Sequence, residues 1–168
     1  YIDKIKSLEP DLIIVMGSCL ICSEIISIPK YIINMHTGLS PYYRGGYTNL
    51  WPILNDDYGY FGVTVHTMSS GIDSGEIVYT ARPNISLEDN YGSINAKAII
   101  MGSDLMVATI NHIKNDDLTT KKQWLYGNLF HNHHFNNYIA YKYFNKRRDY
   151  INKFCELAQK NKLDNVVL

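Results

Sequence analysis

The stretch Pro10-Asp11-Leu12-Ile13-Ile14-Val15-Met16-Gly17-Ser18 decides the fold class of this chain. Its middle is a short run of apolar side chains, with a proline before it and a Gly-Ser pair after it. Apolar runs of this length are typical of strands that are buried on both faces of a parallel sheet. We therefore expect a central parallel strand at Asp11 to Met16, and with it an α/β fold.

The segments downstream of this strand continue the α/β pattern. In chain order we expect a helical turn at Ser23 to Ile26, a buried strand at Tyr31 to Asn34, a helix at Thr48 to Leu54, strands at Tyr60 to Met68 and Glu76 to Arg82, and a long amphipathic helix through Ile113 that starts at a Ser86/Asp89 capping box. The fold class that follows is a Rossmann-like, mostly parallel sheet with flanking helices.

The composition divides the chain into two expected parts. Residues 1–115 form the α/β domain, and residues 116–168, rich in Asn, Lys, Tyr and His, form a small C-terminal appendage. In the appendage we expect a short hairpin at Trp124 to Phe130 and helices at Asn136 to Phe144 and Arg148 to Lys160. Because a complete doubly wound domain needs roughly 60–90 further residues upstream, we expect the α/β domain to be truncated at its N-terminus.

The charge balance argues against large anionic partners. Lys plus Arg and Asp plus Glu number 16 each, so no net attraction toward nucleic acid or an anionic membrane is expected, and a small polar substrate fits better. The longest apolar stretch is too short to span a bilayer. Three cysteines and the lack of a leader-like start favour the cytoplasm.

Polar residues gather where two expected strands end. The segment from Met35 to Gly46, which follows Asn34 and contains His36, is a loop rich in glycine and proline. Open α/β sheets bind ligands at such loops. The turn Gly71-Ile72-Asp73-Ser74-Gly75 follows the next strand. Taken singly, His36 fits a strand-end histidine and Asp73 a turn former, whereas the combination favours catalysis.

These motifs resemble the catalytic domain of the folate-dependent formyltransferase family, which includes glycinamide ribonucleotide, methionyl-tRNA and nucleotide-sugar formyltransferases. The resemblance runs from about Pro10 to Ile113. The matching positions are Asn34, His36, Leu39, Pro41, Gly45, Gly71, Asp73 and Gly75. The chain departs from the family pattern at Thr37, Gly38 and Ser40.

The resemblance implies roles for these residues. An amine would attack the formyl carbon of 10-formyltetrahydrofolate, with His36 and Asn34 stabilising the oxyanion and Asp73 charging His36 or accepting a proton. The implied folate contacts are Leu20, Ile21 and Cys22 on one side and Ser70, Gly71 and Ile72 on the other. The implied acceptor contacts are Tyr42 and Arg44, the latter through a phosphate.

The favoured acceptor is a nucleotide-linked amino sugar, because the Ser-Pro-Tyr-Tyr-Arg-Gly-Gly loop at residues 40–46 and the tail look most like the sugar-modifying members. A tRNA-modifying member is expected to carry a basic C-terminal RNA-binding segment, whereas we expect a neutral tail here. The alternatives are a formyltetrahydrofolate hydrolase, a glycinamide ribonucleotide or methionyl-tRNA formyltransferase, and a truncated non-catalytic domain that binds folate or forms dimers. A homodimer is included among the expected partners.

Three further signals are assigned to structure. Cys19 and Cys22 form a C-x-x-C pattern without a second pair to complete a zinc site, so a buried or half-buried loop pair is expected. The histidines at 131, 133 and 134 lie among asparagines and fit a solvated turn, and residues 146–148 fit an exposed helix face. No bound metal is expected.

Overall fold

The computed structural model describes residues 1–146 and 149–161, and its central feature is a four-stranded sheet. Its strands, in spatial order, are β1 (Leu12–Met16), β2 (Tyr31–His36), β4 (Val63–Thr67) and β5 (Ile77–Ala81). β1 pairs with β2 in parallel, while β4 runs antiparallel to both of its neighbours. Three of the four strands therefore share one direction, and the Rossmann-like, mostly parallel fold class is confirmed.

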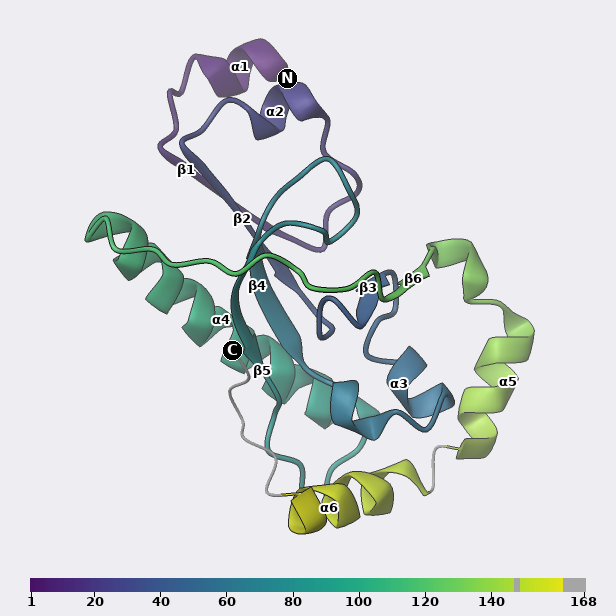
Figure 1. Ribbon diagram of the computed structural model, residues 1–168. Coiled ribbons are helices and arrows are strands. Elements are labelled where there is room, and N and C mark those ends of the chain that lie inside the picture. The colour runs from purple at the N-terminus through teal and green to yellow at the C-terminus, as the bar shows by residue number, and fades with distance from the viewer. Residues whose placement is uncertain (147–148, 162–168) are drawn as a thin grey trace.

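Helices flank this sheet (Figure 1). The short helices α1 (Ile2–Lys6) and α2 (Ser23–Ile26) lie beside β1 and β2, and the long helix α4 (Tyr91–Lys114) crosses one face along β4 and β5. Within residues 1–146 and 149–161, α4 alone is long and apolar enough to cross a membrane. Its buried residues recur at helical spacing toward the sheet, as in a core helix: Ile94, Ala98, Gly102, Met106 and Thr109.

The two central strands have one apolar and one polar face. Ile33 and Met35 of β2 and Val63 and Val65 of β4 are buried in the core cluster with Met106 of α4. Their sequence neighbours point the other way, because successive side chains of a strand alternate between faces. That opposite face carries Asn34, His36, Thr64 and His66, all of them buried.

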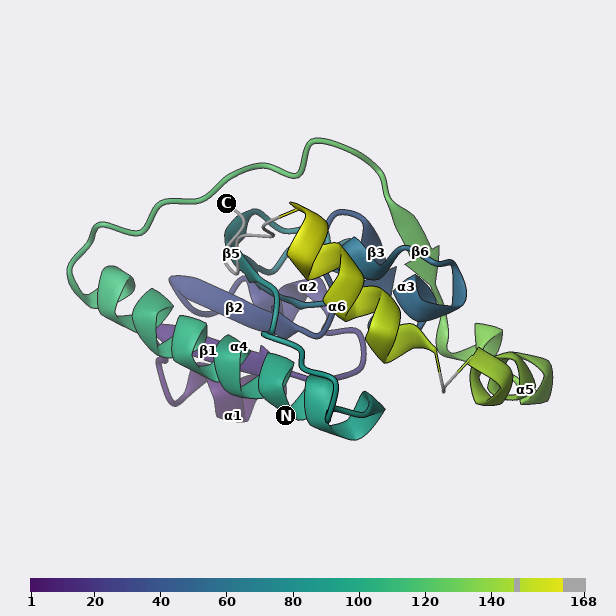
Figure 2. The same cartoon turned by 90° about the horizontal axis from the view of Figure 1, so that it is seen from below.

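A second layer of structure covers this polar face. β3 (Tyr43–Gly45) pairs in parallel with β6 (Asn128–Phe130), and the short helices α3 (Trp51–Leu54) and η1 (Tyr58–Tyr60) lie beside it. After β6 come η2 (Asn132–His134), α5 (Asn137–Lys146), which packs on α3, and α6 (Tyr150–Asn161), which packs on η1. Figure 2 shows the segment from α4 to β6 running across the molecule to reach this layer.

Three predicted elements are wrong in detail. The strand expected at the centre of the sheet, β1, lies instead at the edge of the described four-stranded sheet, where only β2 pairs with it, and Ile14 and Met16 are about half exposed. No hairpin forms at residues 124–130; β6 instead pairs with β3, and Lys121 forms an isolated bridge with Ile77. The long helix starts at Tyr91, because Asn90 supplies the capping box with Ser93, whereas Ser86 and Asp89 close a separate turn before it. Of the predicted exposed face at residues 146–148, only Lys146 lies within the described residues, and it pairs with Asp56.

Candidate active site

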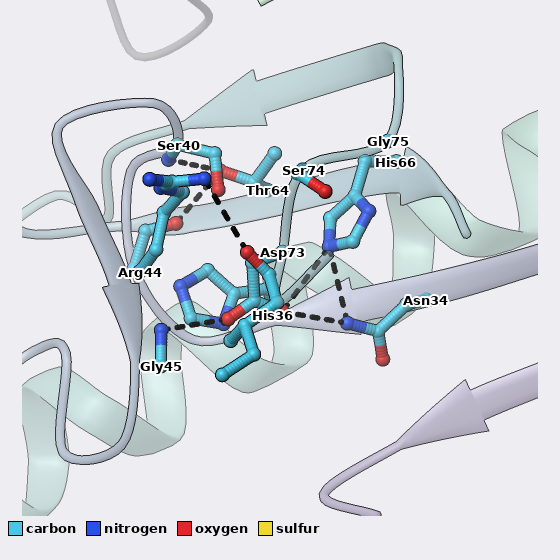
Figure 3. Close-up of polar contacts among 12 residues, drawn as sticks. Asn34, His36, Ser40, Arg44, Gly45, Thr64, His66, Asp73, Ser74 and Gly75 are labelled. Atoms are coloured by element: carbon cyan, nitrogen blue, oxygen red, sulfur yellow. Dashed lines mark hydrogen bonds and ion pairs between the residues drawn. The ribbon is translucent and has the colours of Figure 1, made fainter. Parts of the chain in front are cut away.

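The amide of Asn34 and the imidazole of His36 come from alternate positions at the carboxyl end of β2, so both point from the same face of the sheet. Asp73 reaches them from the turn between β4 and β5, where its backbone has a φ of 45°. Figure 3 shows these three side chains converging, with His66 beside them. The predicted trio is thus brought together from two separate segments.

The carboxylate of Asp73 is the centre of the cluster. Its Oδ2 accepts a hydrogen bond from the Gly45 N–H at 2.7 Å and lies 3.3 Å from Nδ1 of His36. Its Oδ1 accepts from Nδ2 of Asn34 at 3.4 Å. The other ring nitrogen of His36, Nε2, lies 3.0 Å from the backbone oxygen of Tyr43, so both nitrogens of this imidazole face acceptor oxygens.

Burial and charge act against each other at this pair. Burial alone would raise the pKa of Asp73, but a hydrogen bond from the doubly protonated form of His66, the charge of His36 and the Gly45 N–H outweigh it and lower the pKa to about 2. Burial lowers the pKa of His36 below its ordinary value, and the neighbouring Asp73 carboxylate only partly offsets this. The site therefore holds a firmly ionised carboxylate beside an imidazole that gives up its second proton readily.

Two glycines allow close backbone contacts next to this cluster. Gly45, which donates to Asp73, has a φ of 96°, and a side chain there would collide with the backbone oxygen of Phe130. A side chain at Gly75 would collide with the backbone oxygen of Thr67. The family motif positions Gly45 and Gly75 thus have a steric reason in this chain.

Two polar residues at the site, His66 and Gln123, are not predicted from the sequence. Nε2 of His66 lies 3.1 Å from Nδ2 of Asn34 and 3.5 Å from Oδ1 of Asp73. Nε2 of Gln123 donates to the backbone oxygens of Asp73 at 2.7 Å and Gly75 at 2.9 Å, which fixes the turn between β4 and β5. The alternation in β4 placed His66 opposite the apolar face, but only the pairing of β4 with β2 reveals its neighbour; no local pattern marks Gln123.

A cavity of about 430 Å³ opens beside the cluster. One wall is formed by the loop after β1 and another by the β4–β5 turn. A third is formed by Phe130, His131 and Asn132, which were not among the predicted site residues. Five of the predicted folate contacts line it: Leu20, Ile21, Ser70, Gly71 and Ile72. Cys22 does not; it is the exposed N-cap residue of α2.

Neither of the two predicted acceptor contacts lines the cavity. Tyr42 packs its ring against Tyr60 at 4.4 Å and Trp124 at 6.0 Å, and it does not line the cavity. Arg44, on β3, donates from Nη1 to the backbone oxygen of Ile72 at 3.5 Å. Its placement supports the β4–β5 turn, and its role in acceptor binding stays a prediction.

The cysteine and histidine signals do not form a metal cluster within residues 1–146 and 149–161. Cys19 and Cys22 are both free and exposed, so the expectation of a buried or half-buried pair is wrong, because the loop after β1 lies at the open rim of the cavity. His131 and His133, at the start of η2 and within it, are exposed, and their stacked rings have centroids 5.4 Å apart.

An α/β sheet that presents an amide, two imidazoles and a carboxylate beside a cavity at its strand ends has the features of a small-molecule site of the α/β class. The comparison with known families identifies the type. Residues 1–110 match the family model described as formyl transferase. The chain belongs to the formyl transferase family, and the resemblance of its motifs is confirmed.

Relatives of known name agree with this assignment. The methionyl-tRNA formyltransferase of Clostridium novyi is 35% identical over 125 residues, covering 73% of this chain and 40% of that protein. The methionyl-tRNA formyltransferase of Ehrlichia ruminantium (strain Welgevonden) is 37% identical over 115 residues, covering 67% of this chain and 38% of that protein. The chain thus spans about two fifths of the length of these curated relatives.

Solved structures share the fold. A 4-N formyltransferase from Francisella tularensis superposes with a TM-score of 0.67 at 26% identity, covering 79% of this chain and 55% of that one. The formyltransferase PseJ from Anoxybacillus kamchatkensis, solved with UDP-4,6-dideoxy-4-formamido-L-AltNAc and tetrahydrofolate, superposes with a TM-score of 0.69 at 23% identity, covering 86% and 76% of the two chains.

Proposed function

We propose that the protein transfers a formyl group from 10-formyltetrahydrofolate to an amine. The observation that carries the proposal is the contact of Asp73 with both Asn34 and His36 at the edge of a 430 Å³ cavity. Such a volume is in the range of small-molecule sites. The donor would lie between the loop after β1 and the β4–β5 turn, where Leu20, Ile21, Ser70, Gly71 and Ile72 line the cavity.

The chemistry follows from the charges of the cluster. The amine nitrogen bonds to the formyl carbon, and the carbonyl electron pair moves onto the formyl oxygen while the nitrogen becomes positive. An N–H of Asn34 stabilises this oxyanion, a kind of contact that contributes about 2.7–4 kcal/mol per donor. The Asp73 carboxylate takes the proton of the nitrogen directly or through His36.

Collapse of the intermediate completes the transfer. The oxyanion electrons re-form the carbonyl, the bond from the formyl carbon to N10 of the folate breaks, and the proton held at Asp73 or His36 passes to N10. A carboxylate with a pKa of about 2 alone would hold that proton weakly. The His36 imidazole, 3.3 Å away, is therefore the better proton carrier of the pair.

A nucleotide-linked amino sugar is the favoured acceptor. The support is the composition of the loop at residues 40–46 and the likeness, at 26% identity, to a 4-N formyltransferase. Methionyl-tRNA is the second candidate, because the curated relatives are named methionyl-tRNA formyltransferase. The expectation of a neutral tail is wrong, because residues 116–168 contain nine Lys or Arg and five Asp or Glu, a net charge of +4.

The acceptor is tested with the protein as its natural gene encodes it. Release of tetrahydrofolate is followed with a UDP- or dTDP-linked amino sugar, glycinamide ribonucleotide, methionyl-tRNA or buffer alone. Turnover with an amino sugar only is expected. Turnover with methionyl-tRNA only would make methionyl-tRNA the acceptor in place of the amino sugar. Equal turnover in buffer alone would identify a hydrolase. Folate binding without any turnover would identify a binding domain.

The Asp73→Asn variant tests the catalytic assignment. Asparagine keeps the size and turn-forming ability of Asp73 but removes the negative charge that favours a proton on His36, so the rate is expected to fall by roughly 10² or more in a protein that still folds. The exposed variant Asp104→Asn on α4 is the matched control. Wild-type turnover of Asp73→Asn would reduce Asp73 to a turn former.

Three broader assignments belong to the same proposal. The catalytic part is placed at residues 1–115 and the appendage at 116–168, a division supported by the family match ending at residue 110. Action in the cytoplasm is supported by three free cysteines. A homodimer is proposed only by resemblance, and size-exclusion chromatography with light scattering would test it.

A further inference from the structure

We propose that His66 is a positioning residue for the reaction: it fixes the Asn34 side chain with its NH₂ group, rather than its oxygen, toward the reacting atoms. This inference rests on the proposed formyl transfer. An asparagine side chain has two orientations of similar shape, and only one presents donors. Presenting the oxygen would place a partial negative charge against the developing oxyanion.

The fold places His66 opposite Asn34. The two residues are direct partners across the antiparallel pairing of β2 and β4. His66 is 2% exposed, so its ring is held against the site and not in solvent.

A backbone carbonyl selects the protonated nitrogen of His66. Nδ1 lies 2.7 Å from the backbone oxygen of Thr67, which can only accept a hydrogen bond. Nδ1 therefore carries the proton in the neutral ring, and Nε2 is left as an acceptor. The peptide group of Thr67 thus determines which kind of partner His66 can hold.

The acceptor nitrogen in turn determines the orientation of the amide. Nε2 of His66 lies 3.1 Å from Nδ2 of Asn34, an ordinary hydrogen-bond distance. Its distance to Oδ1 of Asp73 is longer, at 3.5 Å. One N–H of Asn34 is occupied by His66, and the other points to Oδ1 of Asp73 at 3.4 Å. That second, longer contact is the one that is replaced when a formyl oxygen arrives.

Two substitutions separate the two nitrogens of His66. In His66→Gln the side-chain oxygen can occupy the place of Nε2 and still accept from Asn34. In His66→Asn the shorter side chain can keep the local contact to Thr67 but cannot reach Asn34. With the naturally encoded protein, kcat of His66→Asn is expected to fall about 10²-fold, with little change in KM for the folate donor, while His66→Gln stays within about 10-fold of wild type.

A double-mutant cycle tests whether the effect passes through Asn34. In an Asn34→Ala background, His66→Asn is expected to lower kcat by less than about 3-fold, because there is no amide left to orient. An undiminished 10²-fold loss in that background would overturn the proposal, as would a His66→Gln variant that melts like wild type and is as slow as His66→Asn.

A spectroscopic measurement tests the proposal without turnover. The nitrogen-15 chemical shifts of the His66 ring at neutral pH are expected to show a protonated Nδ1 and a bare Nε2. A proton on Nε2 would contradict the orientation of Asn34 even if every variant failed to fold. If wild type transfers no formyl group while the ring shows the expected tautomer, formyl transfer fails as the function and the His66–Asn34 geometry stands.

Discussion

At the scale of single residues, Asp73 makes the free energy of unfolding depend on pH. Its pKa of about 2 in the folded protein lies below its ordinary value of 3.8, so its ionised form favours folding. This contribution is complete above about pH 5 and is lost as the pH falls toward the folded-state pKa. The free energy of unfolding of wild type relative to Asp73→Asn is expected to drop by about 2 kcal/mol between about pH 5 and pH 2. Urea titrations at stepped pH measure it, and parallel curves for the two proteins would contradict it.

His36 is expected to act on charge that exists only in the transition state. We predict that His36→Ala abolishes formyl transfer and leaves folate affinity nearly unchanged. Titration with a non-reactive folate analogue, next to a rate assay, provides both numbers, and His112→Ala on α4 serves as the control. A large loss of affinity with little loss of rate would make His36 a ligand contact instead.

How far the site could be predicted depends on the range of the contacts. Asn34 and His36 are two positions apart on one strand, and Asp73 lies in a recognisable turn, so a linear pattern contains all three. His66 joins them only through the pairing of β2 with β4, and Gln123 only through a contact across fifty residues of chain. Neither register nor such a contact is written in a local stretch of sequence.

At the scale of elements, α4 depends on its first residue. The Asn90 side chain accepts from the N–H groups of Gly92 and Ser93, which have no partner within the helix. We predict that Asn90→Ala lowers the free energy of unfolding by about 1 kcal/mol. Ser103→Ala, at an exposed position within the same helix, should change it by only a few tenths. Thermal or urea unfolding of the pair is the measurement, and equal effects would remove the cap as the cause.

The elements themselves were largely predictable, and the errors have physical reasons. Strands β1, β2, β4 and β5 follow from apolar runs between turn residues. The predicted start of α4 is wrong because Ser86 with Asp89 and Asn90 with Ser93 show the same capping spacing, and local sequence does not distinguish them. The predicted hairpin at β6 is wrong because the partner of β6, β3, lies far upstream in the sequence.

At the scale of the whole molecule, Phe130 fastens the tail to the α/β part. Its ring stacks on Trp51 of α3 at 4.2 Å and on Tyr43 of β3 at 5.9 Å, and it lines the cavity. We predict that Phe130→Ala lowers the free energy of unfolding by about 2 kcal/mol and raises KM for the folate donor. Melting curves and substrate titrations check both effects.

The control for that prediction is Tyr126→Ala, which removes an aromatic ring of the same segment that is 97% exposed. It should leave both the melting temperature and KM unchanged. A similar loss of stability in the two variants would mean that the segment is held by something other than the Phe130 stack.

The hold of Gln123 on the β4–β5 turn has a consequence for the order in which the protein matures during translation. When a ribosome has released the chain only as far as α4, every strand of the main sheet is present, but the residue that grips the backbone of Asp73 has not yet appeared. The strands of the four-stranded sheet are therefore synthesised before the residue that holds the β4–β5 turn. A nascent chain that ends at α4 is expected to be inactive, because it lacks Gln123 and also the α6 residues that complete the core cluster around Ile94 and Ala98. Competence for the proposed formyl transfer is thus expected to arrive late in synthesis and not gradually along it.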